Sequence, residues 1–165
     1  MEKLKVYLDT NTIIDFFMNQ ARALKGKESF KMPKKLDFFI DSLDKINFTT
    51  SLITKGEIFR EMSAGYHLTE KEITDLWDKF IRILNCQYIS KVEIDERFAQ
   101  LPLKIKLKLR TLMNFQHLFI AMKEDAYLVS GDGDLIKVVR ENKIYDKILS
   151  YIDLRKLIAS FSQDL

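Results

Sequence analysis

The stretch that decides the fold is LKVYLDTN, residues 4–11. Residues 4–8 are mostly apolar and include a valine and a tyrosine, which are side chains that favour strands. The run stops at Asp9, and polar residues from Asn11 onward are suited to cap a helix through the apolar residues that follow. A short apolar run that is closed by polar residues at its carboxyl end is typical of a buried strand. We therefore predict a strand over residues 4–8, followed directly by a helix.

The rest of the chain alternates in the same way. Residues 127–129 form a second buried apolar run, closed by SGDGD at 130–134, and further strands are expected at 48–51, 87–92 and 147–152. Helices are expected between them, at 12–17, 36–43, from Ser51 or Thr54 through 62, from 69 to 84, over 94–113 with a break at Pro102, at 115–123, from 135 to 139, and after Asp153 through 158. Thr69 and Glu72 have the spacing of a capping box. Alternating strands and helices predict an α/β fold with a central, mainly parallel sheet.

The composition narrows the class of protein. A chain of 165 residues, 47% of them hydrophobic, fits a single folded domain over residues 1–165. Cys86 is the only cysteine, which excludes an internal disulfide and argues against a structural zinc site. The chain shows no signal-peptide pattern after Met1 and no apolar run near the ~20 residues of a membrane span. We expect a soluble, cytoplasmic protein without a membrane partner, with an exposed Lys-rich insertion around residues 20–35.

Acidic residues follow two of the predicted strands. Asp9 ends the first, and Asp132 and Asp134 follow the strand at 127–129. Ligands of parallel sheets bind at the carboxyl ends of strands, so these side chains are candidates for one shared site. Crowded carboxylates repel each other unless a cation neutralises them, and oxygen ligands suit hard divalent cations. Metal ions at such sites support phosphodiester hydrolysis because they activate water and stabilise the attacking and leaving oxygens of the in-line displacement at phosphorus.

Four motifs carry a resemblance to a known family. Residues 6–14, VYLDTNTII, resemble the opening motif of PIN-domain nucleases, and residues 49–58 are similar to their second motif, in which a helix contributes a glutamate. Residues 114–121 resemble the third motif and residues 128–135 the fourth. Together, in order, the four motifs cover nearly the whole chain. The resemblance implies a PIN-like three-layer α/β/α fold.

The resemblance also implies a function and a set of roles. It implies a metal-dependent endoribonuclease that uses Mg²⁺ or Mn²⁺ and a water nucleophile to hydrolyse RNA. Many small members of the family are VapC-like toxins. By that analogy the partners would be RNA, a second copy of the chain in a homodimer, and an antitoxin peptide. By analogy, the metal ligands are Asp9, Glu57 and Asp132, the residue that ligates or orients water is Asp134, and the supporting hydrogen-bonding residues are Asn11 and Ser130.

Asn114 departs from the family pattern, which usually has an aspartate at this place. An amide oxygen can coordinate a cation, but it brings no negative charge, so cation binding should be weaker. We keep Asn114 in the candidate catalytic set. Three interpretations remain open at this point: a natural variant with weaker metal binding, a degenerate domain, or an inactivating substitution.

Two other functions compete with the nuclease. A degenerate, non-catalytic PIN module could bind RNA or protein, and Asn114 is its main support. A haloacid-dehalogenase-like phosphatase also opens with a strand-end aspartate and has a late Gly-Asp, here Gly131-Asp132. That family normally carries an acid two residues after the first aspartate, where this chain has Asn11, which counts against it.

Several candidate residues also have a purely structural interpretation. Asp9 could simply cap a helix, residues 132–134 could be a plain turn, and Glu57 could be a solvated helix residue. His117 is expected mainly to pack, although it lies three residues after Asn114 and so on nearly the same helix face. A basic run before Asn114 could be a solvated face or could hold RNA phosphates; its members are Lys104, Lys106, Lys108 and Arg110.

Overall fold

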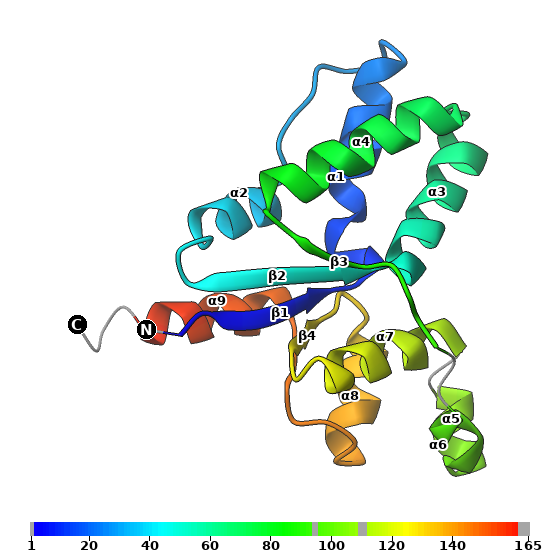
Figure 1. Cartoon of the computed structure of the whole chain (residues 1–165), viewed down its shortest axis with the longest axis vertical. Helices are drawn as coiled ribbons and strands as arrows, with labels where there is room; N and C mark the ends of the chain where they lie inside the picture. The colour runs from blue at the N-terminus through cyan, green and yellow to red at the C-terminus, as the bar shows by residue number, and fades with distance from the viewer. Residues whose placement is uncertain (1, 94–95, 109–111, 162–165) are drawn as a thin grey trace.

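A five-stranded, all-parallel sheet forms the centre of the molecule (Figure 1). The computed structural model describes residues 2–93, 96–108 and 112–161. The strand order is β3-β2-β1-β4-β5. The strands are β1 (Leu4–Leu8), β2 (Ile46–Ser51), β3 (Gln87–Ile89), β4 (Tyr127–Val129) and β5 (Ile148–Leu149). The predicted α/β class with a central parallel sheet is confirmed.

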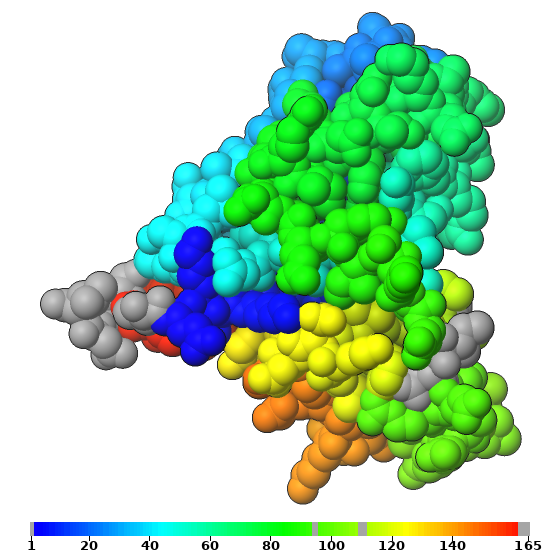
Figure 2. Space-filling view, in the orientation of Figure 1, coloured from blue at the N-terminus to red at the C-terminus, as the bar shows by residue number. Residues whose placement is uncertain are grey.

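Helices cover both faces of the sheet, which gives the three-layer α/β/α arrangement. Figure 2 shows the two groups in space-filling form, with α3 and α4 on one side of β1 and α7 and α8 on the other. The helices are α1 (Thr10–Leu24), α2 (Lys34–Asp41), α3 (Leu52–Tyr66), α4 (Glu70–Ile83), α5 (Arg97–Gln100), α6 (Leu103–Lys108), α7 (Leu112–Lys123), α8 (Gly133–Glu141) and α9 (Tyr151–Ser160).

Alternation along β1 builds two separate cores. Val6 and Leu8 face the larger core, which α1 to α4 and α9 complete, whereas Tyr7 between them faces the core of α6, α7 and α8. All three side chains are fully buried. Because both faces of such a strand are covered, its sequence is apolar at nearly every position rather than at alternate ones.

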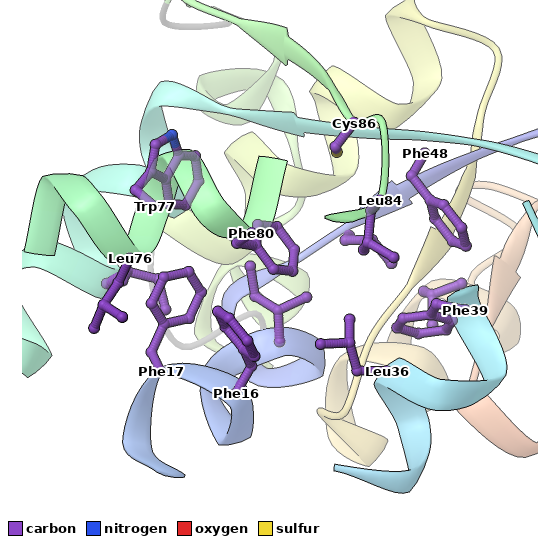
Figure 3. Packing of buried hydrophobic residues seen from close by; sticks show 14 of the residues in the cluster. Phe16, Phe17, Leu36, Phe39, Phe48, Leu76, Trp77, Phe80, Leu84 and Cys86 are labelled. Carbon is purple, nitrogen blue, oxygen red and sulfur yellow. The ribbon is translucent and has the colours of Figure 1, made fainter. Parts of the chain in front are cut away.

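Aromatic rings fill the larger core (Figure 3). The Phe80 ring lies 5.4 Å from the ring of Phe17 and 6.0 Å from that of Trp77, measured between centroids. Trp77 in turn stacks on Phe17 with an interplanar angle of 23°. Since aromatic side chains bury large apolar areas, this cluster should supply much of the stability of the α1–α4 side.

The order of the strands creates a topological switch point beside β1. The chain runs from β1 outward through β2 and β3, and then returns to place β4 on the other side of β1. Leu8 at the end of β1 is in register with Val129 at the end of β4. The helices that follow these strands, α1 and α8, pack in different cores, and in α/β sheets such a divergence leaves a crevice at the carboxyl ends of the two strands. Asp9 and Ser130 are the first residues beyond the two strands.

Most helix predictions hold, with corrections at the ends. The Thr69–Glu72 capping box is present, and a break at Pro102 separates α5 from α6. β3 and β5 are shorter than expected. Two predicted caps are wrong: Asp9 rather than Asn11 caps α1, and Ser150 rather than Asp153 caps α9. The helix α1 begins two residues and α9 three residues earlier than the apolar pattern suggested, because a polar side chain already accepts a backbone N–H there.

The Lys-rich segment is divided between regular elements. Its start, residues 20–24, belongs to α1, and Lys34 and Lys35 begin α2. The loop between them is anchored by Phe30, whose ring packs edge-on against Phe16 at 6.1 Å. Across the described ranges, no helix is both long and apolar enough to cross a membrane.

We expect Phe80→Ala to destabilise the protein by about 3–5 kcal/mol, because it removes a fully buried ring from the aromatic cluster. Urea unfolding monitored by circular dichroism would measure the loss. Ile152→Ala on α9 is the matched control, since Ile152 is 62% exposed and its truncation should cost less than about 0.5 kcal/mol. Equal losses in the two variants would contradict the assignment of the core.

Candidate functional site

Asp9 is held in a nearly closed pocket at the end of β1, where it is only 4% exposed. Oδ1 accepts hydrogen bonds from the backbone N–H and the hydroxyl of Thr12, at 3.1 and 2.8 Å. Oδ2 accepts from the hydroxyl of Ser130 at 2.6 Å. Burial raises the pKa of the Asp9 carboxyl, although the hydrogen bonds from Ser130 and Thr12 act in the opposite direction. Asp9 therefore caps α1, and it is also a carboxylate kept from solvent.

Ser130 links Asp9 to Asp132. Its hydroxyl donates to Asp9 and accepts from the backbone N–H of Asp132 at 3.1 Å. The half-buried Asp132 caps α8, and its Oδ1 accepts from the backbone N–H groups of Asp134 and Leu135, both at 3.0 Å. The β1–α1 and β4–α8 turns are thus joined through side chains, as expected for two loops at one switch point.

Gly131 allows these two turns to approach each other. A Cβ placed on Gly131 would lie 3.2 Å from the Cβ of Asn11, closer than most real contacts of this kind. The side chain of Asn11 is exposed and makes no hydrogen bond to the described residues, so its contribution is close packing of the turn. Ser130, the other residue expected to support the site, hydrogen-bonds to both flanking acids.

Glu57 on α3 approaches from the β2 side. Its Oε1 accepts from the hydroxyl of Thr10 at 2.9 Å and contacts Nε2 of His117 at 2.6 Å. Burial alone would raise the pKa of Glu57, but the hydrogen bonds from His117 and Thr10 outweigh it and hold the pKa below its usual value. Glu57 is therefore an ionised carboxylate that is hydrogen-bonded to Thr10, the residue next to Asp9 in the chain.

His117 is more than the packing residue that the sequence suggested. It is 3% exposed, and its other ring nitrogen, Nδ1, lies 2.8 Å from the hydroxyl of Tyr7. Tyr7 also contacts the hydroxyl of Ser51 at 2.8 Å. Burial, the main cause, raises the pKa of Tyr7 above its usual value. A buried polar network thus runs from the second core to Glu57.

Asn114 lies beside the acidic group on α7. Its Nδ2 is 3.5 Å from Oδ2 of Asp132, a long contact at the limit of hydrogen bonding. The amide of Asn114 therefore lies next to Asp132. The remaining candidate, Asp134, is exposed on the first turn of α8.

The basic residues before Asn114 lie on different surfaces. Lys106 donates to the backbone carbonyl of Ala99 at 2.6 Å, and Lys104 is exposed. Lys108 and Lys137 line, together with Asp134, a hollow of about 330 Å³ between α6 and α8. Arg110 lies outside the described residues. Lys108 is thus the member of the basic run that the structure brings to the acidic residues.

The donor set has the right chemistry for Mg²⁺ or Mn²⁺ but not a finished cation geometry. Carboxylate oxygens are the ligands that these ions prefer. Yet no three Asp, Glu, His or Cys side chains among residues 2–93, 96–108 and 112–161 come close enough together to hold one ion. Hydrogen bonds occupy both oxygens of Asp9 and one oxygen each of Glu57 and Asp132. Cation binding would have to rearrange these side chains.

Comparison with known proteins identifies no relative: no protein-family model matches the chain, and no curated protein matches it either. The resemblance to PIN nucleases therefore rests on the four sequence motifs alone.

Sequence reasoning missed Tyr7, Thr10 and Thr12 as parts of the site and undervalued His117. Spacing along the chain could have indicated three of these residues. His117 follows Asn114 by about one helical turn, and Thr10 and Thr12 come directly after the predicted strand end. Tyr7 gave no such signal, because a tyrosine inside an apolar strand reads as core.

Asp9→Asn should stabilise the folded protein at pH 7 by about 0.5–2 kcal/mol, because it removes a buried charge and keeps a good helix cap. The folded-state pKa of Asp9 is raised, so its ionised form opposes folding above the unfolded pKa of about 3.9. The gain should therefore shrink as the pH falls toward 4. Unfolding in urea at several pH values measures it.

Asp9→Ala is the matched comparison, because it removes the same charge together with the cap. Loss of the Thr12 hydrogen bonds should cost about 1 kcal/mol and offset the gain from neutralisation. If Asp9→Asn were less stable than the parent protein, with the same pH dependence of the free energy of unfolding, burial would not be destabilising the Asp9 carboxylate.

Proposed function

We propose that this protein is a metal-dependent endoribonuclease that hydrolyses RNA phosphodiester bonds at the crevice between β1 and β4. One observation carries the proposal. Acids from three distant segments, Asp9, Glu57 and Asp132, gather at the topological switch point: Glu57 accepts from Thr10, the chain neighbour of Asp9, and Ser130 donates to the Asp9 carboxylate and accepts from the backbone N–H of Asp132. A structural role alone would not require three acids there, because the caps of α1 and α8 need only two.

Magnesium or manganese, when bound, would supply the charge that lets these acids share a site and would help ionise the attacking water. In the proposed reaction, water attacks phosphorus, the bond to one ribose oxygen breaks, and that oxygen leaves with a proton. Glu57, held ionised, can accept a hydrogen bond from the water, and Asp132 offers Oδ2 at the same edge.

Basic residues beside the acids favour a polyanionic substrate. Lys108 and Lys137 line the hollow next to Asp134 together with Glu141, which lies 3.9 Å from Lys137, so we expect Lys108 to be the side chain there that contacts an RNA phosphate. Phosphate contacts of this type add affinity without sequence preference. This arrangement supports RNA rather than a small phosphate ester as the substrate.

The direct test is cleavage of a fluorescently labelled single-stranded RNA with Mg²⁺ or Mn²⁺. We expect activity that EDTA abolishes and that falls by at least about 100-fold in Asp9→Asn, Glu57→Gln and Asp132→Asn. Asp15→Asn is the matched control, since Asp15 is a partly exposed acid whose carboxylate pairs with Lys35 away from the acidic site. RNA binding without cleavage in any metal would instead favour the non-catalytic module.

Asn114→Asp should raise activity and lower the Mn²⁺ concentration needed for half-maximal cleavage by about tenfold, because it adds a negative charge beside Asp132. The same substitution should destabilise the metal-free protein slightly through repulsion between the two carboxylates. Titration of Mn²⁺ in the cleavage assay measures the first effect. An unchanged or higher Mn²⁺ concentration for half-maximal cleavage would contradict the placement of Asn114 in the site.

The phosphatase alternative makes a different prediction for Asp9. A phosphatase of that class would form a phospho-aspartate there, which mass spectrometry after acid quenching would detect. The toxin role, the antitoxin peptide and the homodimer stay proposals by analogy, and copurification of a peptide with the full chain would test them.

A further inference from the structure

The donor and the acceptor can be assigned for each hydrogen bond of the buried network that joins Ser51, Tyr7 and His117 to Glu57. The hydroxyl of Ser51 accepts from the backbone N–H of Ile53 at 3.2 Å, so its own hydrogen is available to donate. Tyr7 Oη lies 2.8 Å away and can accept it. The hydrogen of Tyr7 then points to Nδ1 of His117, also at 2.8 Å.

His117 completes the assignment. With Nδ1 accepting from Tyr7, the ring hydrogen sits on Nε2, where it donates to Oε1 of Glu57 at 2.6 Å. The reverse tautomer would leave Nε2 facing a carboxylate at 2.6 Å with no hydrogen between them. In a network this deeply buried, each unmade hydrogen bond is costly.

We propose that His117 is a positioning residue for the acidic site: the Ser51–Tyr7–His117 relay fixes Oε1 of Glu57 and leaves Oε2 for the ligand. Oε1 accepts from both His117 and Thr10, whereas Oε2 makes no hydrogen bond to the described residues. The relay thereby selects which oxygen of Glu57 serves the site. The identity of that ligand, a divalent cation, rests on the proposed function, whereas the orientation of Glu57 does not.

The relay also explains why a tyrosine occupies the middle of a buried strand. Tyr7 is fully buried in the second core, where phenylalanine would pack equally well without a polar group to satisfy. Its hydroxyl reaches Ser51 at the end of β2 and His117 on α7, so it couples the two elements that flank Glu57. Residues that hydrogen-bond to a ligand-binding side chain in this way fix its orientation.

Nitrogen-15 NMR of the full-length protein tests the relay without reference to activity. We expect His117 to show a single tautomer with the hydrogen on Nε2, while the exposed His67, the only other histidine, averages both tautomers. In Tyr7→Phe the donor to Nδ1 is lost, so the Nδ1 chemical shift should change while Glu57 still keeps the hydrogen on Nε2. A hydrogen on Nδ1 of His117, or averaging like that of His67, would overturn the proposal.

A matched pair of substitutions tests positioning. The side-chain nitrogen of His117→Gln can replace Nε2 and donate to Glu57, whereas that of His117→Asn reaches only the place of Nδ1. We expect kcat for RNA cleavage to fall by about 10–100-fold in His117→Asn and to be largely retained in His117→Gln, with KM little changed in both. Equal losses of kcat in two folded variants would overturn positioning.

These outcomes separate the two proposals. The Nε2 tautomer in a protein that cleaves no RNA would uphold the relay and contradict the nuclease. Cleavage with the wrong tautomer would uphold the nuclease and contradict the relay.

Discussion

The site depends on keeping negative charge at the end of a buried strand. Asp9 sits where both faces of the sheet are covered, and a carboxylate there loses its hydration. Thr12 and Ser130 replace the lost water, and the Ser130 bond also ties β1 to β4 across the switch point. The two turns therefore keep their close approach because an acid has to be satisfied between them.

Glu57 meets the same constraint from the other side of the crevice. Its donors come from α1, through Thr10, and from α7, through His117. Each acid of the group is thus restrained by an element other than its own, which fixes the group relative to the sheet. Networks of this kind rigidify a site, and each member is costly to remove. Every one of these acids also has protein donors, which offset part of the cost of placing negative charge there.

The sequence was a good guide to this molecule wherever one strong local signal existed. The apolar runs ending at Leu8 and Val129 defined the two central strands, and the strand-end acids followed from them. It was a poor guide to the ends of β3 and β5, which are edge strands of three and two residues and so too short to carry a clear pattern. The role of His117 was out of reach, because Tyr7 and Glu57 lie 110 and 60 residues away in the chain and only the fold brings them to its ring.

The central claim is that Asp9, Glu57 and Asp132 serve one ligand. Paramagnetic broadening by Mn²⁺ tests it most directly, because the effect reports distance from the bound ion. At substoichiometric Mn²⁺, backbone NMR signals around all three acids should disappear together, and excess Mg²⁺ should restore them. Broadening that starts at separate surface carboxylates, and spares the turns after β1 and β4, would contradict the account.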